Sequence, residues 1–336
     1  MRDKKARFAN LTVSWISALI CVSMSIASAG SPDTLDIVHI SDTHICNLDG
    51  YHPRFVESQK HYGSGARVFA AFLKAIPGEL NADALIITGD LIDFYEAETR
   101  RSEMLATQIE QFVTLTDPCP VPLYMTLGNR DITSYWVDEE DTTIDYLKHQ
   151  IHAQKARATW IRTTPCFHNG TYYARDFAVG NTTFHFLFLD NGYSLHDGGR
   201  MIDKPQLDWL VHHVDKAGAD PVVIFMHIYL SVGDKNGDGL FFQQRELDWP
   251  DDISCSSGLL RVLNENRHIK ALFVGHGHKN VIEKIDFPAG HDIYQCETGG
   301  FGDKPDNWRL LRFTDKSIVV CEPGVRRAER IISLSE

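Results

Sequence analysis

The chain has 336 residues, of which 43% are hydrophobic and 23% charged, and its formal net charge is −12 at pH 7. This ordinary globular composition is long enough for one large α/β domain or two small ones. The strong negative charge argues against a nucleic-acid backbone or an anionic membrane as the main partner. It still allows a small phosphorylated substrate, because bound cations can reverse the sign of the field locally.

The N-terminal segment differs from the rest of the chain. A basic start is followed by an apolar, Ser-rich stretch from Leu11 to Ala29, which ends in Ala27-Ser28-Ala29. This pattern is typical of a signal peptide. An uncleaved membrane anchor is the alternative, because the stretch approaches spanning length, but its serines and small-residue end favour removal. We predict a signal peptide over residues 1–29, one domain over residues 30–336, and a secreted or periplasmic protein without stable membrane insertion.

Six cysteines follow the predicted signal peptide: Cys46, Cys119, Cys166, Cys255, Cys296 and Cys321. An even number of cysteines in an exported protein permits disulfides, although six cysteines allow fifteen pairings. Buried free thiols in a large core are the alternative.

Short apolar runs alternate with helical patterns, and each run ends where a polar motif begins. The runs predict strands over 35–40, 84–88, 123–127, 183–189, 222–226 and 271–274. Amphipathic patterns predict helices over 66–76, 104–115 and 206–216. This alternation indicates an α/β sheet whose ligands bind at the carboxyl ends of its strands. Three further runs, over 281–287, 292–296 and 309–320, predict successive antiparallel strands in a mixed second sheet.

Side chains that bind metals follow five of the predicted strands: Asp42, His44, Asp90, Asn129, His227, His276 and His278. These residue types suit Zn, Mn, Fe or Ni better than Ca. Seven ligands are too many for one tetrahedral site, but they suit two metal ions if one carboxylate bridges them. In an extended chain, residues at i and i+2 point the same way, so Asp42/His44 and His276/His278 can each act as a pair. Nearby glycines at 89, 128, 275 and 277 permit tight turns.

The motifs that carry these residues are Asp42-Thr-His44, Gly89-Asp90-Leu-Ile-Asp93, Gly128-Asn129-Arg130-Asp131, His227 and Gly275-His276-Gly-His278. In this order they resemble the calcineurin-like metallophosphoesterase family over about residues 35–280. The resemblance implies an α/β/β/α sandwich of two mixed β-sheets. It also implies that Asp42, His44 and His278 hold one metal ion. Asn129, His227 and His276 would hold the other, with Asp90 bridging the two.

A weaker signal points to the cyclic-nucleotide phosphodiesterase and purple acid phosphatase-like branch. It consists of Leu189-Asp190-Asn-Gly192 followed by Gln206-Leu-Asp-Trp209-Leu. Any amphipathic helix with an aromatic anchor would show the second part equally well.

One position departs from the family pattern, because Arg130 stands where the family has histidine. An arginine stays protonated, so it can clamp phosphate oxygens but cannot donate a proton to a leaving group. The same Gly-Asn-Arg-Asp variant occurs in UDP-diacylglucosamine hydrolases, which cleave a pyrophosphate, although the rest of this chain does not follow them closely. Arg130 and Asp90 are the catalytic residues we predict.

The resemblance implies a hydrolase in which two transition-metal ions lower the pKa of a bridging water, so that hydroxide attacks phosphorus. We predict that it cleaves phosphodiester or pyrophosphate bonds of small phosphorylated substrates. One alternative is a phosphomonoesterase on the same fold. Another is a non-catalytic metal-binding interaction scaffold, which only Arg130 favours.

Several weaker signals stay open. Residues 234–239 resemble the start of a calcium loop, but Arg245 stands where that loop needs a glutamate, so a polar loop at the site rim is our first interpretation. Asn169 and Asn181 begin glycosylation sequons. Four loop histidines could reach the substrate: His52, His61, His168 and His196. We expect structural or surface roles for His39, His185, His212 and His213.

Overall fold

The computed structural model describes residues 32–335 except for 64, 139–141, 144–145, 193–201, 233–239 and 243–254. Its first large sheet has six strands, in the order β18 (Ala328–Ser333), β17 (Ser317–Cys321), β16 (Arg309–Thr314), β1 (Thr34–Ile40), β2 (Ala84–Thr88) and β5 (Leu123–Thr126). Strands β1, β2 and β5 are parallel, whereas β16 pairs antiparallel with β1. This sheet is therefore mixed.

The second large sheet also has six strands, in the order β14 (Val281–Phe287), β15 (His291–Glu297), β13 (Ile269–Val274), β10 (Val222–Phe225), β9 (Thr182–Phe188) and β8 (Tyr173–Val179). Its four central strands are parallel, and the two edge strands pair antiparallel with their neighbours. All residues of β10 and β13 are buried. A parallel strand covered on both faces reads as a continuous apolar run, which is why the sequence identified these strands.

Alternate side chains of the second sheet belong to two different cores. Val223 and Phe225 of β10 pack in the core that the two sheets share, whereas Val222 and Ile224 pack in the core of the outer face. This alternation follows from the two-residue period of a strand. Each sheet thus has one face toward the other sheet and one face toward helices.

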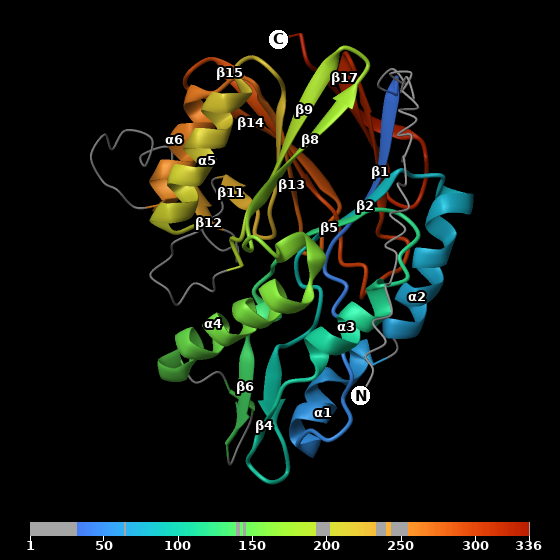
Figure 1. The fold of residues 1–336 in the computed structure, drawn as a ribbon, viewed down its shortest axis with the longest axis vertical. Coiled ribbons are helices and arrows are strands. Elements are labelled where there is room, and N and C mark those ends of the chain that lie inside the picture. Colours follow the sequence, from blue (N-terminus) through green and yellow to red (C-terminus); the bar gives the residue numbers. More distant parts are fainter. Residues whose placement is uncertain are drawn as a thin grey trace, which may run out of the picture. The chain divides into compact units, whose positions relative to one another are not determined.

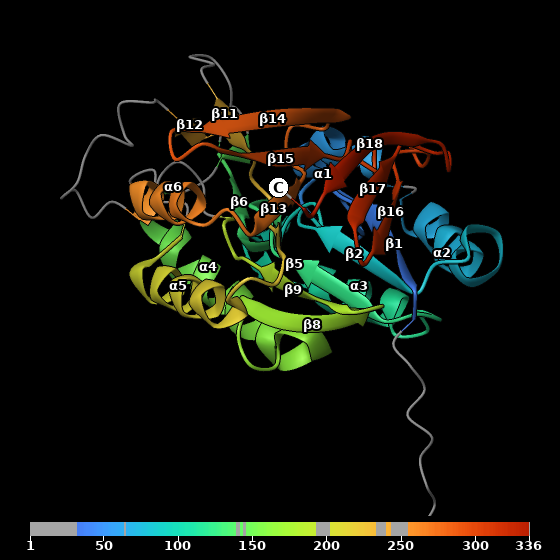
Figure 2. The same cartoon turned by 90° about the horizontal axis from the view of Figure 1, so that it is seen from above.

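Helices cover both outer faces (Figures 1 and 2). Leu207 and Leu210 of α5 (Lys204–Ala217) and Leu263 of α6 (Cys255–Glu265) pack on the outer face of the second sheet. Phe69 of α2 (Gly65–Ala75) and Phe112 of α3 (Gln108–Thr116) belong to the larger core cluster, which also contains the buried residues of the first sheet. The predicted α/β/β/α sandwich is confirmed.

A smaller part of the fold lies beyond the carboxyl ends of β2 and β5. It contains α1 (Pro53–Gln59), α4 (Tyr146–Thr163) and a four-stranded sheet of β4 (Met104–Leu105), β3 (Glu96–Glu98), β6 (Ser134–Val137) and β7 (Thr142–Thr143). Tyr51, Phe55, Phe94 and Tyr135 form its aromatic core. A two-stranded sheet of β11 (Leu230–Val232) and β12 (Leu240–Phe242) follows β10 in the chain.

Two predictions about the elements are wrong. The C-terminal strands do not form one sheet, because β14 and β15 extend the second sheet while β16, β17 and β18 extend the first. The helix predicted over 104–115 begins only at Gln108, since residues 104–105 form strand β4.

The cysteines among the described residues form no disulfides, as the alternative interpretation of buried free thiols expected. Cys46, Cys119, Cys166, Cys296 and Cys321 are all free. Cys255 begins α6, and its side chain lies outside the described residues, as do the predicted signal peptide, His196 and the loop 234–239. None of the helices in the described part of the chain combines the length and apolar character that a membrane crossing requires.

Candidate metal centre

The predicted metal ligands converge in two groups at the carboxyl ends of the strands. Asp42, His44 and His278 form one group, and the ligand atoms lie within 4.8 Å of one another. Asp90, His227 and His276 form the other group, and their ligand atoms also lie within 4.8 Å of one another. Residues from both ends of the chain therefore meet at one place, as the order of the motifs implied.

The first group is held at ligand spacing. His278 Nε2 lies 3.2 Å from His44 Nε2 and 3.2 Å from Asp42 Oδ1. His44 Nε2 lies 3.8 Å from the same Asp42 oxygen. Ligands about 2.0–2.2 Å from one tetrahedral ion are roughly 3.3–3.6 Å apart, so the three atoms have the separations that a shared ion requires.

The second group includes the predicted asparagine. His227 Nε2 lies 3.3 Å from Asp90 Oδ1, 3.3 Å from His276 Nδ1 and 3.1 Å from Asn129 Oδ1. Asp90, His276 and Asn129 thus each place a possible ligand atom within 3.3 Å of His227 Nε2.

Asp90 connects the two groups through its two carboxylate oxygens. Its Oδ1 lies beside His227, whereas its Oδ2 lies 3.8 Å from His44 Nε2. A carboxylate with one oxygen toward each group has the geometry of a bridging ligand.

The backbone at these residues is strained. Asp42, His44, Asp90, His276 and His278 all have positive φ, between 44° and 73°. Non-glycine residues with positive φ are uncommon, and such strain concentrates at functional sites. We predicted that Asp42 and His44 point the same way because the chain there is extended. The backbone is instead left-handed at both residues, so that reason is wrong.

At two of the predicted glycines, another loop comes so close to the backbone that a side chain would not fit; neither glycine has a positive φ. A Cβ on Gly275 would lie 1.7 Å from Ser41 Oγ, and one on Gly128 would lie 2.2 Å from the Asp90 nitrogen. No real Cβ tolerates such contacts, so both positions require glycine. Close approach brings the loop after β13 against the loop after β1, and the loop after β5 against Asp90.

The far nitrogens of the histidines have hydrogen-bond partners. His44 Nδ1 lies 3.2 Å from Asp93 Oδ1, and His278 Nδ1 lies 2.5 Å from Asp303 Oδ2. The Thr88 carbonyl oxygen accepts from His227 Nδ1 at 2.8 Å. Such partners fix the tautomer and orientation of a metal-binding imidazole.

Amide side chains fix the turn that carries His227. Asn191 Oδ1 accepts from the backbone nitrogens of His227 (2.8 Å) and Ile228 (3.0 Å), and its Nδ2 donates to the Ile228 carbonyl (2.8 Å). Gln206 binds both backbone groups of the preceding Asp190, at 2.8 and 2.9 Å. The two segments that suggested the phosphodiesterase and purple acid phosphatase-like branch are thus in direct contact near the site.

The electrostatics also fit bound cations. Burial alone would lower the pKa of His227, but Asp90 outweighs it and raises the pKa to about 10. Asp42 does the same for His278, whose pKa rises to about 9. Protons on these rings balance the buried carboxylates in the protein without metal, and a metal ion would displace them. Asp42 Oδ1 is buried and faces the ring nitrogens of His278 and His44, so an ion bound between these groups could contact it.

Arg130 lies at the edge of this centre. Its backbone nitrogen donates to Asp90 Oδ1 at 2.8 Å, and its guanidinium donates to the Tyr135 hydroxyl, with Cζ 6.0 Å from the ring centroid. Tyr135 belongs to the aromatic core of the smaller part of the fold. The arginine therefore connects the metal groups to that part of the protein.

The sequence missed several residues of the centre. Tyr62 stacks on His44 with ring centroids 4.4 Å apart, and its hydroxyl donates to Asp303. No motif marks Tyr62 or Asp303, and the segment Leu189-Asp190-Asn-Gly192 contains Asn191 without indicating that it supports His227. Of the loop histidines, His52 caps α1 and His61 packs on Tyr62.

Comparison with known proteins decides the family. The family model described as calcineurin-like phosphoesterase matches residues 35–280. The chain belongs to this family. It is therefore a metal-dependent phosphoester hydrolase, whose candidate ligands are the two groups described above.

Solved structures of low sequence identity share the fold. A dimetal phosphatase from Danio rerio aligns with a TM-score of 0.57 at 13% identity, over 91% of this chain and 98% of the other. PhoD aligns with a TM-score of 0.52 at 11% identity, over 91% of this chain and 69% of PhoD. No curated protein sequence matches the chain significantly.

Proposed function

We propose that the chain is an exported phosphoesterase that uses two transition-metal ions, of Mn, Fe, Zn or Ni, to cleave phosphodiester or pyrophosphate bonds. Its substrates would be small phosphorylated molecules. The formal net charge of −12 disfavours a nucleic-acid backbone as partner, whereas a local pair of cations would attract a small phosphate ester.

In this proposal Asp42, His44 and His278 hold one ion. Asn129, His227 and His276 hold the other, and Asp90 contacts both. The observation that carries the assignment is the position of the Asp90 carboxylate, with Oδ1 beside His227 and Oδ2 toward His44.

When bound, the ions would supply Lewis acids for a phosphoryl oxygen and a water whose pKa is near neutral. The protein contributes orientation and charge. Burial of Asp42 and Asp90 keeps bulk water from the carboxylates, and His44 and His278 are fixed by Asp93 and Asp303. The Arg130 guanidinium offers permanent positive charge to phosphate oxygens beside the centre. It cannot donate a proton, so bonds with acidic leaving groups, such as pyrophosphates, are favoured.

Elemental analysis of the purified protein tests the bridging assignment. We expect two metal ions per chain under metal-replete conditions. Asp90→Asn should disturb both sites, whereas His278→Ala, the matched variant of a residue in one group only, should mainly remove one ion. At most one ion in the wild type, together with unchanged content in Asp90→Asn, would refute the bridge.

A substrate panel tests the chemistry. Aryl phosphomonoesters, aryl phosphodiesters, cyclic nucleotides and nucleotide-sugars would be assayed with the metal-loaded enzyme. Faster turnover of diesters or nucleotide-sugars supports the proposal, and a clear preference for monoesters would make the chain a phosphomonoesterase.

Export is tested separately. Protein isolated from its native host should begin at or near Gly30, because the segment before it ends in Ala27-Ser28-Ala29. Retention of Met1 in a cytosolic fraction would remove the export proposal and leave the hydrolase chemistry untouched.

A further inference from the structure

The turn that carries two of the candidate ligands passes over the end of a neighbouring strand. Strand β13 ends at Val274 and β14 begins at Val281, so the turn between them contains His276 and His278. Strand β15 lies between β13 and β14 in the sheet. Its last residue, Glu297, pairs with both Val274 and Val281. The turn therefore starts on one side of Glu297 and ends on the other.

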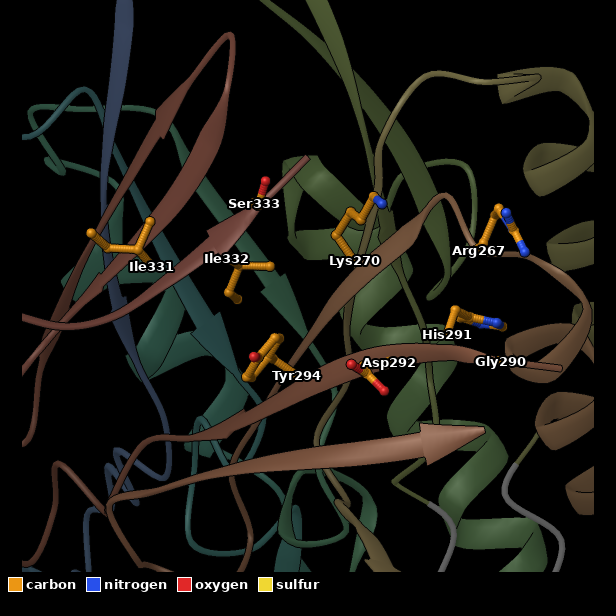
Figure 3. Close-up of a pocket in the computed structure, with 9 residues that line it drawn as sticks. All are labelled: Arg267, Lys270, Gly290, His291, Asp292, Tyr294, Ile331, Ile332 and Ser333. Carbon is orange, nitrogen blue, oxygen red and sulfur yellow. The ribbon is translucent and has the colours of Figure 1, made fainter. Parts of the chain in front are cut away.

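The direction of the strands places Glu297 at the metal centre. Figure 3 shows the opposite end of the sheet, where Lys270 at the start of β13 and Tyr294 on β15 line a cavity of about 280 Å³. Strands β13 and β15 are parallel, so their carboxyl ends lie together at the other end. Glu297 is the carboxyl-terminal residue of β15, next to the point where β13 leads into the turn.

The Glu297 carboxylate is in direct contact with this turn. Its Oε1 accepts a hydrogen bond at 2.9 Å from the backbone nitrogen of Lys279, the residue after His278. A Cβ on Gly277 would lie only 2.5 Å from the same oxygen, so the turn packs on the carboxylate without room for a side chain there. Glu297 is buried. The carboxylate therefore contacts the turn between its two histidines and again just after the second.

Hydrogen bonds to neighbouring loops hold the first half of the turn. The nitrogen of Gly275 donates to the His227 carbonyl at 2.9 Å, and that of His276 donates to Asp42 Oδ2 at 3.0 Å. In the second half, the bond to Glu297 has the same function. Removal of the carboxylate would take this acceptor from a backbone N–H and leave empty space beside the turn, so the turn could shift.

We propose that Glu297 is a positioning residue for both metal ions, although it belongs to neither group of candidate ligands. His276 is assigned to one ion and His278 to the other, so a shift of their common turn changes both sites. This inference rests on the proposed two-ion centre. Groups that orient metal ligands through hydrogen bonds typically contribute about 10–100-fold to metal affinity, and here one carboxylate would contribute to two sites.

Chelator competition with the zinc-loaded protein tests the proposal, because it gives the affinity of each ion. Glu297→Ala removes the acceptor and should weaken both ions about 10–100-fold. Glu297→Gln keeps an oxygen that can accept from the Lys279 nitrogen, so both affinities should stay close to those of the wild type. In the metal-free proteins, the Lys279 amide hydrogen should exchange faster in Glu297→Ala and at the wild-type rate in Glu297→Gln.

Glu283→Ala is the matched control. Glu283 is an exposed carboxylate on β14, whose Oε2 accepts from Gln295 Nε2 at 3.3 Å. Its replacement removes the same charge from the same pair of strands without taking an acceptor from the turn. We expect both ions to bind as in the wild type, and the Lys279 amide to exchange at the wild-type rate.

The possible failures can be told apart. A wild type that binds fewer than two ions would overturn the two-ion centre and this inference with it. If the wild type binds two ions, unchanged affinities in Glu297→Ala, or a loss at one ion only, would overturn the role of Glu297 alone. An equal loss in Glu297→Gln would overturn the hydrogen bond as the cause.

A second variant tests the same contact from the side of the turn. Gly277→Ala places a Cβ where the Glu297 carboxylate lies, so it should displace the turn and weaken both ions even if Glu297→Ala does not fold. Unchanged affinities in Gly277→Ala would show that the turn does not depend on this contact, and the proposal would be wrong.

Discussion

Asn191 is expected to control the second metal group without touching a metal. Its amide makes three hydrogen bonds to the backbone of His227 and Ile228, at 2.8, 3.0 and 2.8 Å, and the side chain is fully buried. Asn191→Ala would leave two N–H groups and one carbonyl without partners in a place that water does not reach. The turn that carries His227 would then lose its fixed position.

The size of the effect follows from these bonds. Each buried backbone group left without a partner costs about 1–3 kcal/mol, so we expect Asn191→Ala to lower the free energy of unfolding by about 3 kcal/mol or more. Loss of a group that orients a metal ligand typically weakens metal binding about 10–100-fold. We therefore expect the ion near His227 to be lost first, while the ion near His44 and His278 stays.

Gln295→Ala is the matched control. Gln295 binds the nitrogen and carbonyl of Leu230 in the same turn, at 2.7 and 2.8 Å, whereas the backbone nitrogen and carbonyl of His227 bind Asn191 and Gly275. Urea denaturation of the metal-free proteins gives the stability loss, and competition with a chelator gives the affinity of each ion. Both variants should lose stability, but only Asn191→Ala should lose affinity for one of the two ions. If Gln295→Ala weakens that ion equally, the effect is general destabilisation, and our reasoning about Asn191 is wrong.

Three further predictions concern other residues. Arg130→His should speed hydrolysis of alkyl esters more than hydrolysis of aryl esters, by up to about 10²-fold. The measurement is kcat/KM for a series of substrates whose leaving groups differ in pKa. If kcat/KM of the wild type does not depend on the leaving-group pKa, the prediction is wrong. Burial and Arg309 lower the pKa of His39 to about 3 from 6.5, so the unfolded chain binds a proton that the fold does not, and stability falls as the pH drops below 6.5. At pH 4.5, His39→Gln should therefore lose about 2–3 kcal/mol less of its free energy of unfolding than the wild type does. Urea denaturation at a series of pH values measures this. If the free energy of unfolding falls equally steeply with pH in both proteins, His39 is not responsible. Gly275→Ala should displace Asp42 and lower the metal content by one ion per chain, as elemental analysis would show. If the variant still binds two ions, the loops that carry Ser41 and Gly275 can move apart without loss of the site.

The sequence predicted most strands of the two large sheets and missed two strands at their edges. The predicted bounds of β2 and of the edge strand β14 agree with the structure, and β10 and β13 were found because they are apolar throughout. The edge strands β8 and β18 were not predicted, and most of their residues are not buried. Which sheet each C-terminal strand joins depends on pairing between residues far apart, such as Leu311 with Ile37, and no local pattern contains that information.

The motifs marked the candidate metal ligands but not the residues that support them. All seven predicted ligands lie in the two groups or beside them, because each follows a strand whose direction the pattern indicated. Asp303 and Tyr62 come from segments without a motif, and only the folded chain brings them to His278 and His44. Sequence order could suggest which side chains meet, but not which neighbours hold them.

The strained loops that carry the candidate ligands are held to each other by backbone hydrogen bonds. A left-handed residue costs on the order of 1 kcal/mol or more, and five of the predicted ligands adopt this conformation. Backbone bonds between loops offset that cost: the nitrogens of Asp42 and His44 donate to the carbonyls of Gly89 and Asp90, at 3.1 and 2.9 Å. Because these bonds do not involve a ligand atom, removal of metal leaves them intact. The fold therefore prepares the ligand positions before an ion binds, which is the arrangement that stabilises developing charge without reorganisation during the reaction.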